Sequence, residues 1–133
     1  MRRLISITAT TLVLAVAAIG AARAAEVRPF DPALFASAQD AGRPILVDVW
    51  ASWCPTCARQ KPIIERLAKD PAFNDLLILK LDYDKHYDLA VGLKAYMQST
   101  LIAFSGRTEV GRTTGDTRED SIRKLFLQAV PGS

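Results

Sequence analysis

The hydrophobic positions of this chain fall into two apolar runs of strand length, separated by stretches with helical spacing. Residues 44–50 and 76–81 are the two runs, and near-continuous apolarity of this kind favours strands covered on both faces of a sheet. Apolar residues at helical spacing predict helices over 58–69 and 88–96. Shorter apolar stretches, 101–104 and 109–113, flank a turn of Ser105, Gly106, Arg107 and Thr108, which predicts a hairpin.

Capping signals place two more helices near the ends of the domain. Asp31 can cap a helix whose first turn tolerates Pro32 and which Gly42 closes. Thr117, with Asp120 three residues later, resembles a capping box that opens a last helix. The predicted order is therefore α-β-α-β-α-β-β-α. Strands joined through helices run parallel with right-handed crossovers, so we expect an α/β fold: a mixed central sheet with helices on both faces.

The first 24 residues differ from the rest of the chain. Arg2 and Arg3 precede an apolar stretch without charges, and Ala22-Arg23-Ala24 has the small-x-small pattern of a cleavage site, so residues 1–24 are predicted to be a secretory signal peptide. An uncleaved membrane anchor is the alternative, because 19 uncharged residues approach the length that spans a bilayer. Either way we expect residues 25–133 to form one exported domain, most simply in the periplasm, with membrane contact only if the segment is retained.

The charge balance of that domain excludes one class of partner. Residues 25–133 hold 14 basic and 14 acidic side chains, although the whole chain carries a formal charge of +3. Nucleic-acid binding proteins concentrate basic charge on the folded part. We therefore expect no nucleic-acid partner.

The candidate chemistry lies in Trp53-Cys54-Pro55-Thr56-Cys57, which contains both cysteines of the chain. At a helix start, positions i and i+3 lie about 5 to 6 Å apart, which suits a reversible disulfide. Cys54 faces the unpaired N–H groups and positive dipole of the helix N-terminus, which favour a thiolate. We expect Cys54 to attack a partner's disulfide and Cys57, more deeply buried, to resolve the mixed disulfide.

Three other interpretations of the cysteine pair each have an observation against them. A purely structural disulfide across so short a loop constrains little chain entropy. A zinc site needs about four ligands, and His86 is the only histidine. A c-type haem attachment needs histidine after the second cysteine, where this chain has Ala58. We expect no metal and no organic cofactor.

Residues 45–57, Ile-Leu-Val-Asp-Val-Trp-Ala-Ser-Trp-Cys-Pro-Thr-Cys, resemble the active-site segment of the thioredoxin family, and the similarity extends over about residues 30–130 with Pro62 in the following helix. The resemblance implies that Asp48 is the family's buried aspartate, that Lys80 is its neighbouring lysine, and that Trp50 and Trp53 pack around the motif. Burial on a core strand should raise the pKa of Asp48, and Lys80 should partly offset that rise. Asp48 could then accept the proton of Cys57; a structural carboxylate is the alternative, as is plain core packing for the tryptophans.

The chain departs from the family where a cis-proline is expected to face the cysteines, because Ser99 stands there. A cis bond before a residue other than proline costs about 2.5 to 4 kcal/mol, so the Gln98–Ser99 bond is either trans with a shifted loop or cis under strain. Substrate recognition should change accordingly. The residues assigned to substrate contact are Trp53, Pro55, Thr56, Gln98 and Ser99.

Together these features predict an exported thioredoxin-like thiol-disulfide oxidoreductase. Its catalytic residues would be Cys54, Cys57, Asp48 and Lys80. Its substrates would be exported proteins with disulfides or thiols, and it would depend on an unidentified redox partner and act as a monomer. The Pro55-Thr56 dipeptide leaves no histidine beside Cys54, which favours a reductant or general exchanger over a strong oxidant. The alternative is a binding module of the same fold that carries a metal or holds a client without turnover.

Overall fold

The computed structural model describes residues 23–130 and 132, so most of the predicted signal segment lies outside the described residues. The strands are β1 (Glu26–Pro29), β2 (Pro44–Trp50), β3 (Leu77–Asp82), β4 (Thr100–Ser105) and β5 (Thr108–Thr114). The helices are α1 (Pro32–Asp40), α2 (Pro55–Ala68), α3 (Tyr87–Gly92) and α4 (Glu119–Ala129), with a short 3-10 turn, η1 (Pro71–Phe73), after α2.

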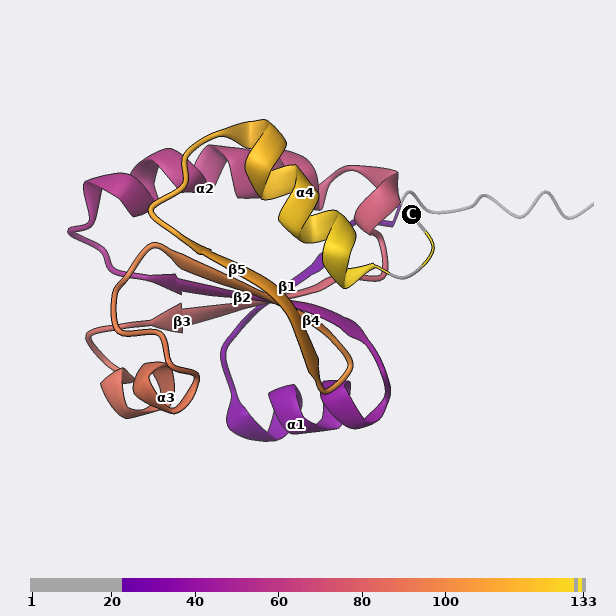
Figure 1. The fold of residues 1–133 in the computed structure, drawn as a ribbon, viewed down its shortest axis with the longest axis horizontal. Helices are drawn as coiled ribbons and strands as arrows, with labels where there is room; N and C mark the ends of the chain where they lie inside the picture. Colours follow the sequence, from indigo (N-terminus) through magenta and orange to yellow (C-terminus); the bar gives the residue numbers. More distant parts are fainter. Residues whose placement is uncertain (1–22, 131, 133) are drawn as a thin grey trace, which may run out of the picture.

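The five strands form one mixed sheet in the order β1-β3-β2-β4-β5. β1 and β2 run parallel to β3, whereas β4 pairs antiparallel with both β2 and β5. Helices α2 and α4 cover one face of the sheet, and α1 and α3 lie on the other (Figure 1). This is the predicted architecture of a mixed central sheet between helices.

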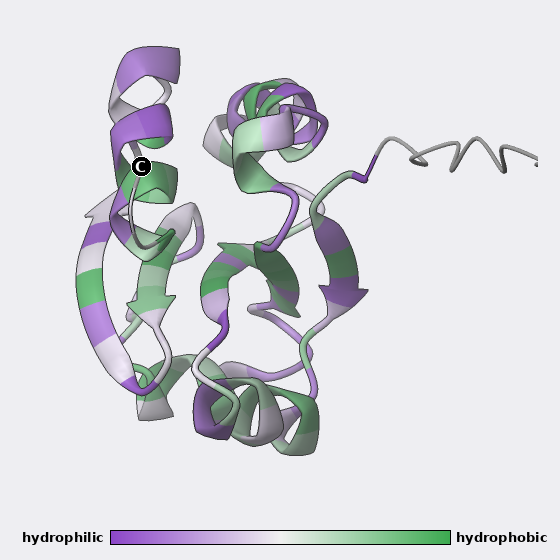
Figure 2. Ribbon diagram, turned by 90° about the vertical axis from the view of Figure 1, so that its right-hand side faces the viewer, coloured by the Kyte–Doolittle hydropathy of each residue, from purple (hydrophilic) through white to green (hydrophobic). Residues whose placement is uncertain are grey.

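The core consists of two apolar layers separated by the sheet. Leu46, Ile78 and Leu101 face α2 and α4, while Val47, Leu79 and Ile102 face the layer of α1 and α3. Strong hydrophobicity is concentrated on the central strands in Figure 2, as expected for strands buried on both faces. The burial of β2 matters most for the site, because the cysteine motif follows directly from its end.

Several local predictions are confirmed. The Asp31 side chain accepts a 2.7 Å hydrogen bond from the backbone N–H of Leu34, so it caps α1 as expected. The predicted hairpin joins β4 to β5, and Gly106 in its turn has φ 57°. A Cβ at Gly106 would also lie 3.2 Å from the Cα of Gly42, so the turn has both a conformational and a steric reason for glycine.

Two helix boundaries differ from the predictions: the start of α2 and the end of α3. α2 begins at Pro55, three residues before the apolar spacing starts, because Cys54 serves as its N-cap. The third helix, predicted over 88–96, covers only Tyr87–Gly92. Lys94 adopts φ 56°, which stops the helix, and the side chain of Tyr96 is 65% exposed instead of packing with Leu93.

Two features near the ends of the domain also differ. β1 was not predicted, because Glu26–Pro29 is a short edge strand with mostly polar or exposed side chains. The Thr117 capping box is wrong, since the N-cap of α4 is Arg118 and no side chain caps it. Asp116 organises this turn instead: its carboxylate accepts a 3.0 Å hydrogen bond from the N–H of Arg118 and a second one from the hydroxyl of Ser121.

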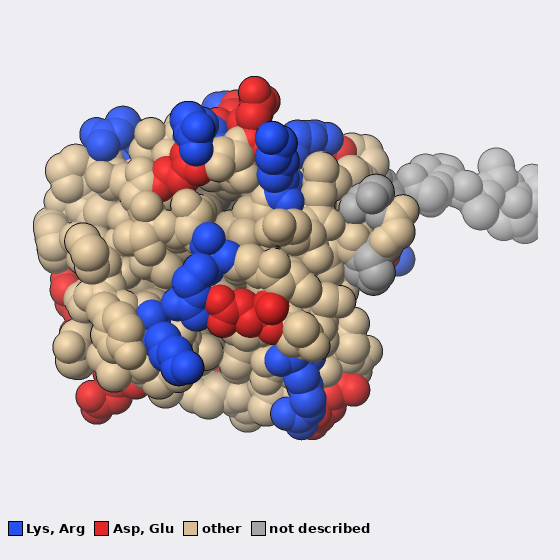
Figure 3. All heavy atoms as spheres, in the orientation of Figure 1, with Lys and Arg blue, Asp and Glu red and all other residues tan. Residues whose placement is uncertain are grey.

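On the face shown in Figure 3, lysines and arginines are interspersed with aspartates and glutamates, in keeping with the balanced charge of the domain. None of the helices in the described part of the chain has both the length and the apolarity needed to cross a bilayer.

Candidate redox site

The cysteine pair lies where β2 ends and α2 begins. Cys54 is the N-cap of α2, and its Sγ accepts a 3.1 Å hydrogen bond from the backbone N–H of Cys57. The two residues form a disulfide with a Cα–Cα separation of 5.3 Å, within the range expected from the spacing. The helix N-terminus therefore directs a backbone donor at the sulfur of Cys54, which is the arrangement that stabilises a thiolate.

The expected difference in burial between the cysteines is wrong for this disulfide-bonded state. Cys54 is 4% exposed and Cys57 is 8% exposed. Both residues pack with Ala51 and the partly buried Trp50. The chemical distinction between the two sulfurs therefore rests on the helix N-cap position of Cys54 and not on its exposure.

Asp48 and Lys80 occupy partner positions on β2 and β3, on the side of the sheet that faces α2. The Nζ of Lys80 lies 3.1 Å from Oδ2 of Asp48. Asp48 is 3% exposed, and its burial raises the pKa of the carboxyl above the ordinary value of 3.8, while the charge of Lys80 and its hydrogen bond act in the opposite direction. The predicted direction of the shift agrees with the structure.

A cavity of about 260 Å³ connects this ion pair to the cysteines. Its walls include Asp48, Cys54, Cys57, Lys61 and Lys80. The cavity is large enough for several water molecules and is lined by polar groups that could bind them. Asp48 and Cys57 therefore share one cavity, which has room for water between them.

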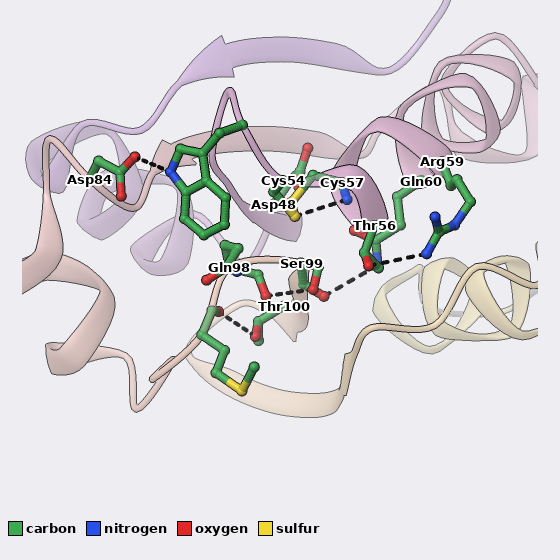
Figure 4. The surroundings of a disulfide bond; sticks show 12 residues. Asp48, Cys54, Thr56, Cys57, Arg59, Gln60, Asp84, Gln98, Ser99 and Thr100 are labelled. Atoms are coloured by element: carbon green, nitrogen blue, oxygen red, sulfur yellow. Dashed lines mark hydrogen bonds between the residues drawn. A yellow bond between two sulfur atoms is a disulfide. The ribbon is translucent and has the colours of Figure 1, made fainter.

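The residues that flank Cys54 project outward. Trp53 is 60% exposed, and its Nε1 donates a 2.7 Å hydrogen bond to Asp84, so plain core packing does not describe it. Pro55 is exposed, and the hydroxyl of Thr56 accepts a 3.3 Å hydrogen bond from Arg59. In the view of Figure 4, Thr56 and Asp84 lie on opposite sides of the disulfide.

Trp50 behaves differently from Trp53. It is partly buried, and the Nζ of Lys80 lies 5.2 Å from the centre of its ring, a distance typical of a cation–π contact. Its Nε1 is buried without a hydrogen-bond partner among the described residues. Trp50 therefore packs against the Asp48–Lys80 pair, inside the site.

Gln98 and Ser99 lie on the loop that enters β4, among the residues that surround the disulfide (Figure 4). No cis peptide bond occurs in the described part of the chain, so the Gln98–Ser99 bond is trans. Ser99 is buried with φ 60°, a left-handed conformation that is uncommon for serine. Its hydroxyl donates a 2.5 Å hydrogen bond to the carbonyl of Gln98. The loop thus differs from one built on a cis-proline.

Sequence reasoning missed Gln60. Its side chain is 1% exposed and donates hydrogen bonds to the carbonyls of Ser99 and Asp116, at 3.2 and 2.8 Å. A signal was present, because residue 60 continues the helical row of Ile63, Ile64 and Leu67 one turn toward the cysteines. A polar side chain on a buried row is an anomaly of the same kind as Asp48 on β2.

Within residues 23–130 and at residue 132, no three His, Cys, Asp or Glu side chains lie close enough together to hold a metal ion. The only described cysteines are those of the disulfide, and His86 lies at the start of α3.

Comparison with known proteins bears directly on this site. The family model described as Thioredoxin matches residues 26–128, which include every strand and helix of the domain except the end of α4. The chain belongs to the thioredoxin family. The thioredoxin-like fold and the Cys54–Cys57 pair make it a thiol-disulfide oxidoreductase of the thioredoxin type.

Individual relatives support the same assignment. The chain is 28% identical over 109 residues to a thioredoxin of Mycobacterium tuberculosis, covering 82% of this chain and 93% of the relative. A bifunctional thioredoxin reductase/thioredoxin of Mycobacterium leprae is 31% identical over 101 residues, covering 76% of this chain but only 22% of that longer protein. The solved structure of Trxlp from Edwardsiella tarda superposes with a TM-score of 0.74 at 36% identity, covering 76% of this chain and 98% of the other.

Proposed function

We propose that this thioredoxin-family protein is exported and exchanges disulfides with cysteines of other exported proteins, as a reductant or general exchanger. The observation that supports it most is the position of Cys54 at the N-cap of α2, with its sulfur 3.1 Å from a backbone N–H. That contact stabilises the attacking thiolate, and no histidine within the motif adds the further stabilisation typical of strong oxidants.

Reduction of a substrate proceeds in two exchanges. The thiolate of Cys54 attacks one sulfur of the substrate disulfide, whose S–S bond breaks and releases one substrate thiolate. Cys57 then attacks the sulfur of Cys54, which releases the second substrate thiolate and forms the Cys54–Cys57 disulfide. Two electrons pass to the substrate, and a dithiol redox partner must return them to begin the next cycle.

Asp48 acts in the second exchange by accepting the proton of the Cys57 thiol. Its raised pKa makes it a stronger base than an exposed aspartate, and the shared cavity gives it a route to Cys57 through water. Lys80 keeps a fraction of the carboxyl ionised by its charge, 3.1 Å away. Burial and the charge of Lys80 together therefore determine the pKa at which Asp48 takes up and releases a proton.

Substrates bind around Cys54. Trp53 and Pro55 offer exposed apolar surface on one side of the disulfide, beside Thr56. On the loop that enters β4, the N–H groups of Gln98 and Ser99 donate no hydrogen bond to another described residue, and these groups would pair with an extended substrate strand.

Export is supported by the sequence and by where the domain begins. Ala25 is buried and its N–H donates a 2.8 Å hydrogen bond to the carbonyl of Ala68, whereas Arg23 and Ala24 are exposed. Cleavage after Ala24 would therefore leave every strand and helix of the domain intact. The periplasm is the proposed location, with a membrane-anchored form facing the periplasm if the segment is retained.

The test combines activity with trapping. Wild-type protein should reduce insulin with dithiothreitol as electron donor, Cys54→Ser should abolish turnover, and Cys57→Ser should accumulate covalent complexes with exported proteins. Equal, partial losses in the two variants would contradict the assigned roles. Fractionation of cells producing the full chain checks export: recovery from the cytoplasm, with residues 1–24 still attached, would contradict it.

A further inference from the structure

The most unusual buried side chain outside the cysteine motif is that of Gln60. It lies one helical turn after Cys57 on α2 and faces the sheet, in the same row as apolar Ile63, Ile64 and Leu67. Only 1% of its surface is exposed. Burying an amide lowers stability unless its polar atoms are hydrogen-bonded, so the partners of this side chain indicate why it is there.

Both N–H donors of Gln60 are used, and each goes to a different loop. One bond reaches the carbonyl of Ser99, just before β4, and the other reaches the carbonyl of Asp116, between β5 and α4. The same Ser99 carbonyl also accepts a 2.9 Å bond from the N–H of Gly115. Two donors from two elements thus fix the direction of the peptide group that follows Ser99. Figure 4 shows Gln60 reaching from the helix of the cysteines to the loop of Ser99.

The amide oxygen of Gln60, in contrast to its nitrogen, forms no hydrogen bond with a described residue. This oxygen, Oε1, is buried. Turning the amide over would aim this oxygen at two carbonyl oxygens, so the two acceptors determine its orientation. An unpaired buried acceptor lowers stability, which an apolar side chain at this position would avoid. Gln60 therefore holds the Ser99 loop at some cost to the stability of the core.

The loop needs such control because of its own conformation. Ser99 has φ 60°, which is uncommon for a residue with a Cβ, and a proline ring, which requires a negative φ, could not adopt it. With a trans peptide bond and no proline ring to stiffen it, the segment depends on hydrogen bonds for its shape. Those to the Ser99 carbonyl come only from Gln60 and Gly115 among the described residues.

We propose that Gln60 is a positioning residue for disulfide exchange with protein substrates. By holding the Ser99 carbonyl, it keeps the Gln98–Ser99 segment in the conformation that pairs with an extended substrate beside Cys54. This role rests on the proposed function, because it concerns the same site. It predicts a defect that depends on substrate size: a folded protein or peptide needs the loop, whereas a small disulfide needs only the sulfur of Cys54.

The experiment compares Gln60→Met and Gln60→Leu with the wild-type protein and with Gln128→Met, a control at an exposed glutamine of α4. Both apolar side chains suit the row in which residue 60 lies. Reduction of insulin and of 5,5′-dithiobis(2-nitrobenzoate) is measured for each protein, together with the rate at which iodoacetamide alkylates Cys54. We expect the KM for insulin to rise about tenfold in the residue 60 variants while kcat changes by less than about twofold. The small disulfide and the alkylation rate should change by less than about twofold.

The outcomes separate the two proposals. Wild-type protein that does not reduce insulin refutes the proposed function. An unchanged KM for insulin in a folded residue 60 variant, or equal losses with both disulfides, overturns the positioning role alone. Failure of both variants to fold also overturns it, because Gln60 would then be required for the fold itself. A KM effect shared by Gln128→Met would show that the change is not specific to this position.

Discussion

Replacing Lys80 with methionine tests whether the Asp48–Lys80 pair acts as a coupled acid–base unit. Methionine keeps most of the apolar stem of the lysine side chain but removes its charge, so the change acts mainly on Asp48. Asp48 is 3% exposed, and Lys80 supplies both causes that lower its pKa. In the variant, burial alone acts on the carboxyl, and its pKa rises further.

The expected loss of stability follows from burial and charge. Removing one partner of a buried ion pair costs about 3 to 5 kcal/mol. The side chain of Lys80 is 32% exposed, so water already screens part of the interaction, and Asp48 can escape the remaining penalty by binding a proton. We therefore expect Lys80→Met to lower the free energy of unfolding by about 2 kcal/mol at pH 8.

The sign of the pH dependence is fixed by the direction of the shift. A raised pKa means that the folded state holds the proton of Asp48 more tightly than the unfolded state, whose value is near 3.8. Stability therefore falls as pH rises from that value through the folded pKa. In Lys80→Met this fall is larger and continues to higher pH. Near pH 4 the variant should lose only about 1 kcal/mol, mostly the contact with Trp50.

The assay is urea unfolding of the oxidised protein at pH 4 and pH 8. It gives the free energy of unfolding of Lys80→Met, of Asp48→Asn and of the double variant. In the double variant, Asp48→Asn should recover about half of the loss at pH 8, because the contact with Trp50 stays lost, which gives a coupling energy of about 1 kcal/mol. Equal destabilisation at both pH values, or additive effects of the two changes, would refute the idea that Lys80 acts through the charge of Asp48.

Three further predictions concern single substitutions. Asp48→Asn should slow insulin reduction about a hundredfold at pH 7 by removing the base for Cys57, while alkylation of Cys54 changes little; unchanged turnover would exclude the assigned role. Lys94→Gly should raise the free energy of thermal unfolding by about 1 kcal/mol, because Lys94 is exposed with φ 56°, and a loss would contradict this. Phe126→Ala should destabilise the domain by about 3 to 5 kcal/mol in urea, because Phe126 is fully buried edge-to-face against Phe73; a loss below about 1 kcal/mol would show that the core repacks.

The sequence predicted those parts of the fold whose free energy comes from burying apolar side chains. The bounds of β2 were predicted from its apolar run, and Asp48 stood out because a carboxyl on such a run is costly. β1 was missed for the opposite reason, since Glu26–Pro29 is held by backbone pairing with β3 and leaves most of its side chains exposed. A strand stabilised by its neighbour's backbone has no hydrophobic period to detect.

Errors at element ends have a different cause. Thr117 and Asp120 have the spacing of a capping box, but Asp116 bonds to both Arg118 and Ser121 and so sets the start of α4 one residue later. Aspartate and threonine side chains both suit hydrogen bonds with nearby backbone N–H groups, and which of them caps the turn depends on the direction in which the chain leaves β5. That direction is a property of the folded sheet.

The residues of the candidate site also differ in whether neighbours along the chain or distant residues determine their role. Cys54 and Cys57 could be predicted because their chemistry depends on neighbours along the chain: a helix start and a spacing of three. Ser99 showed only that the expected proline was missing, since two conformations of the loop were compatible with the sequence. In the trans loop that the structure shows, the Ser99 carbonyl accepts a hydrogen bond from Gln60, 39 residues earlier, and no local pattern links the two positions. A polar residue on a buried helical row is therefore best treated as evidence for an unseen partner, because an amide with so little exposed surface must satisfy its donors somewhere.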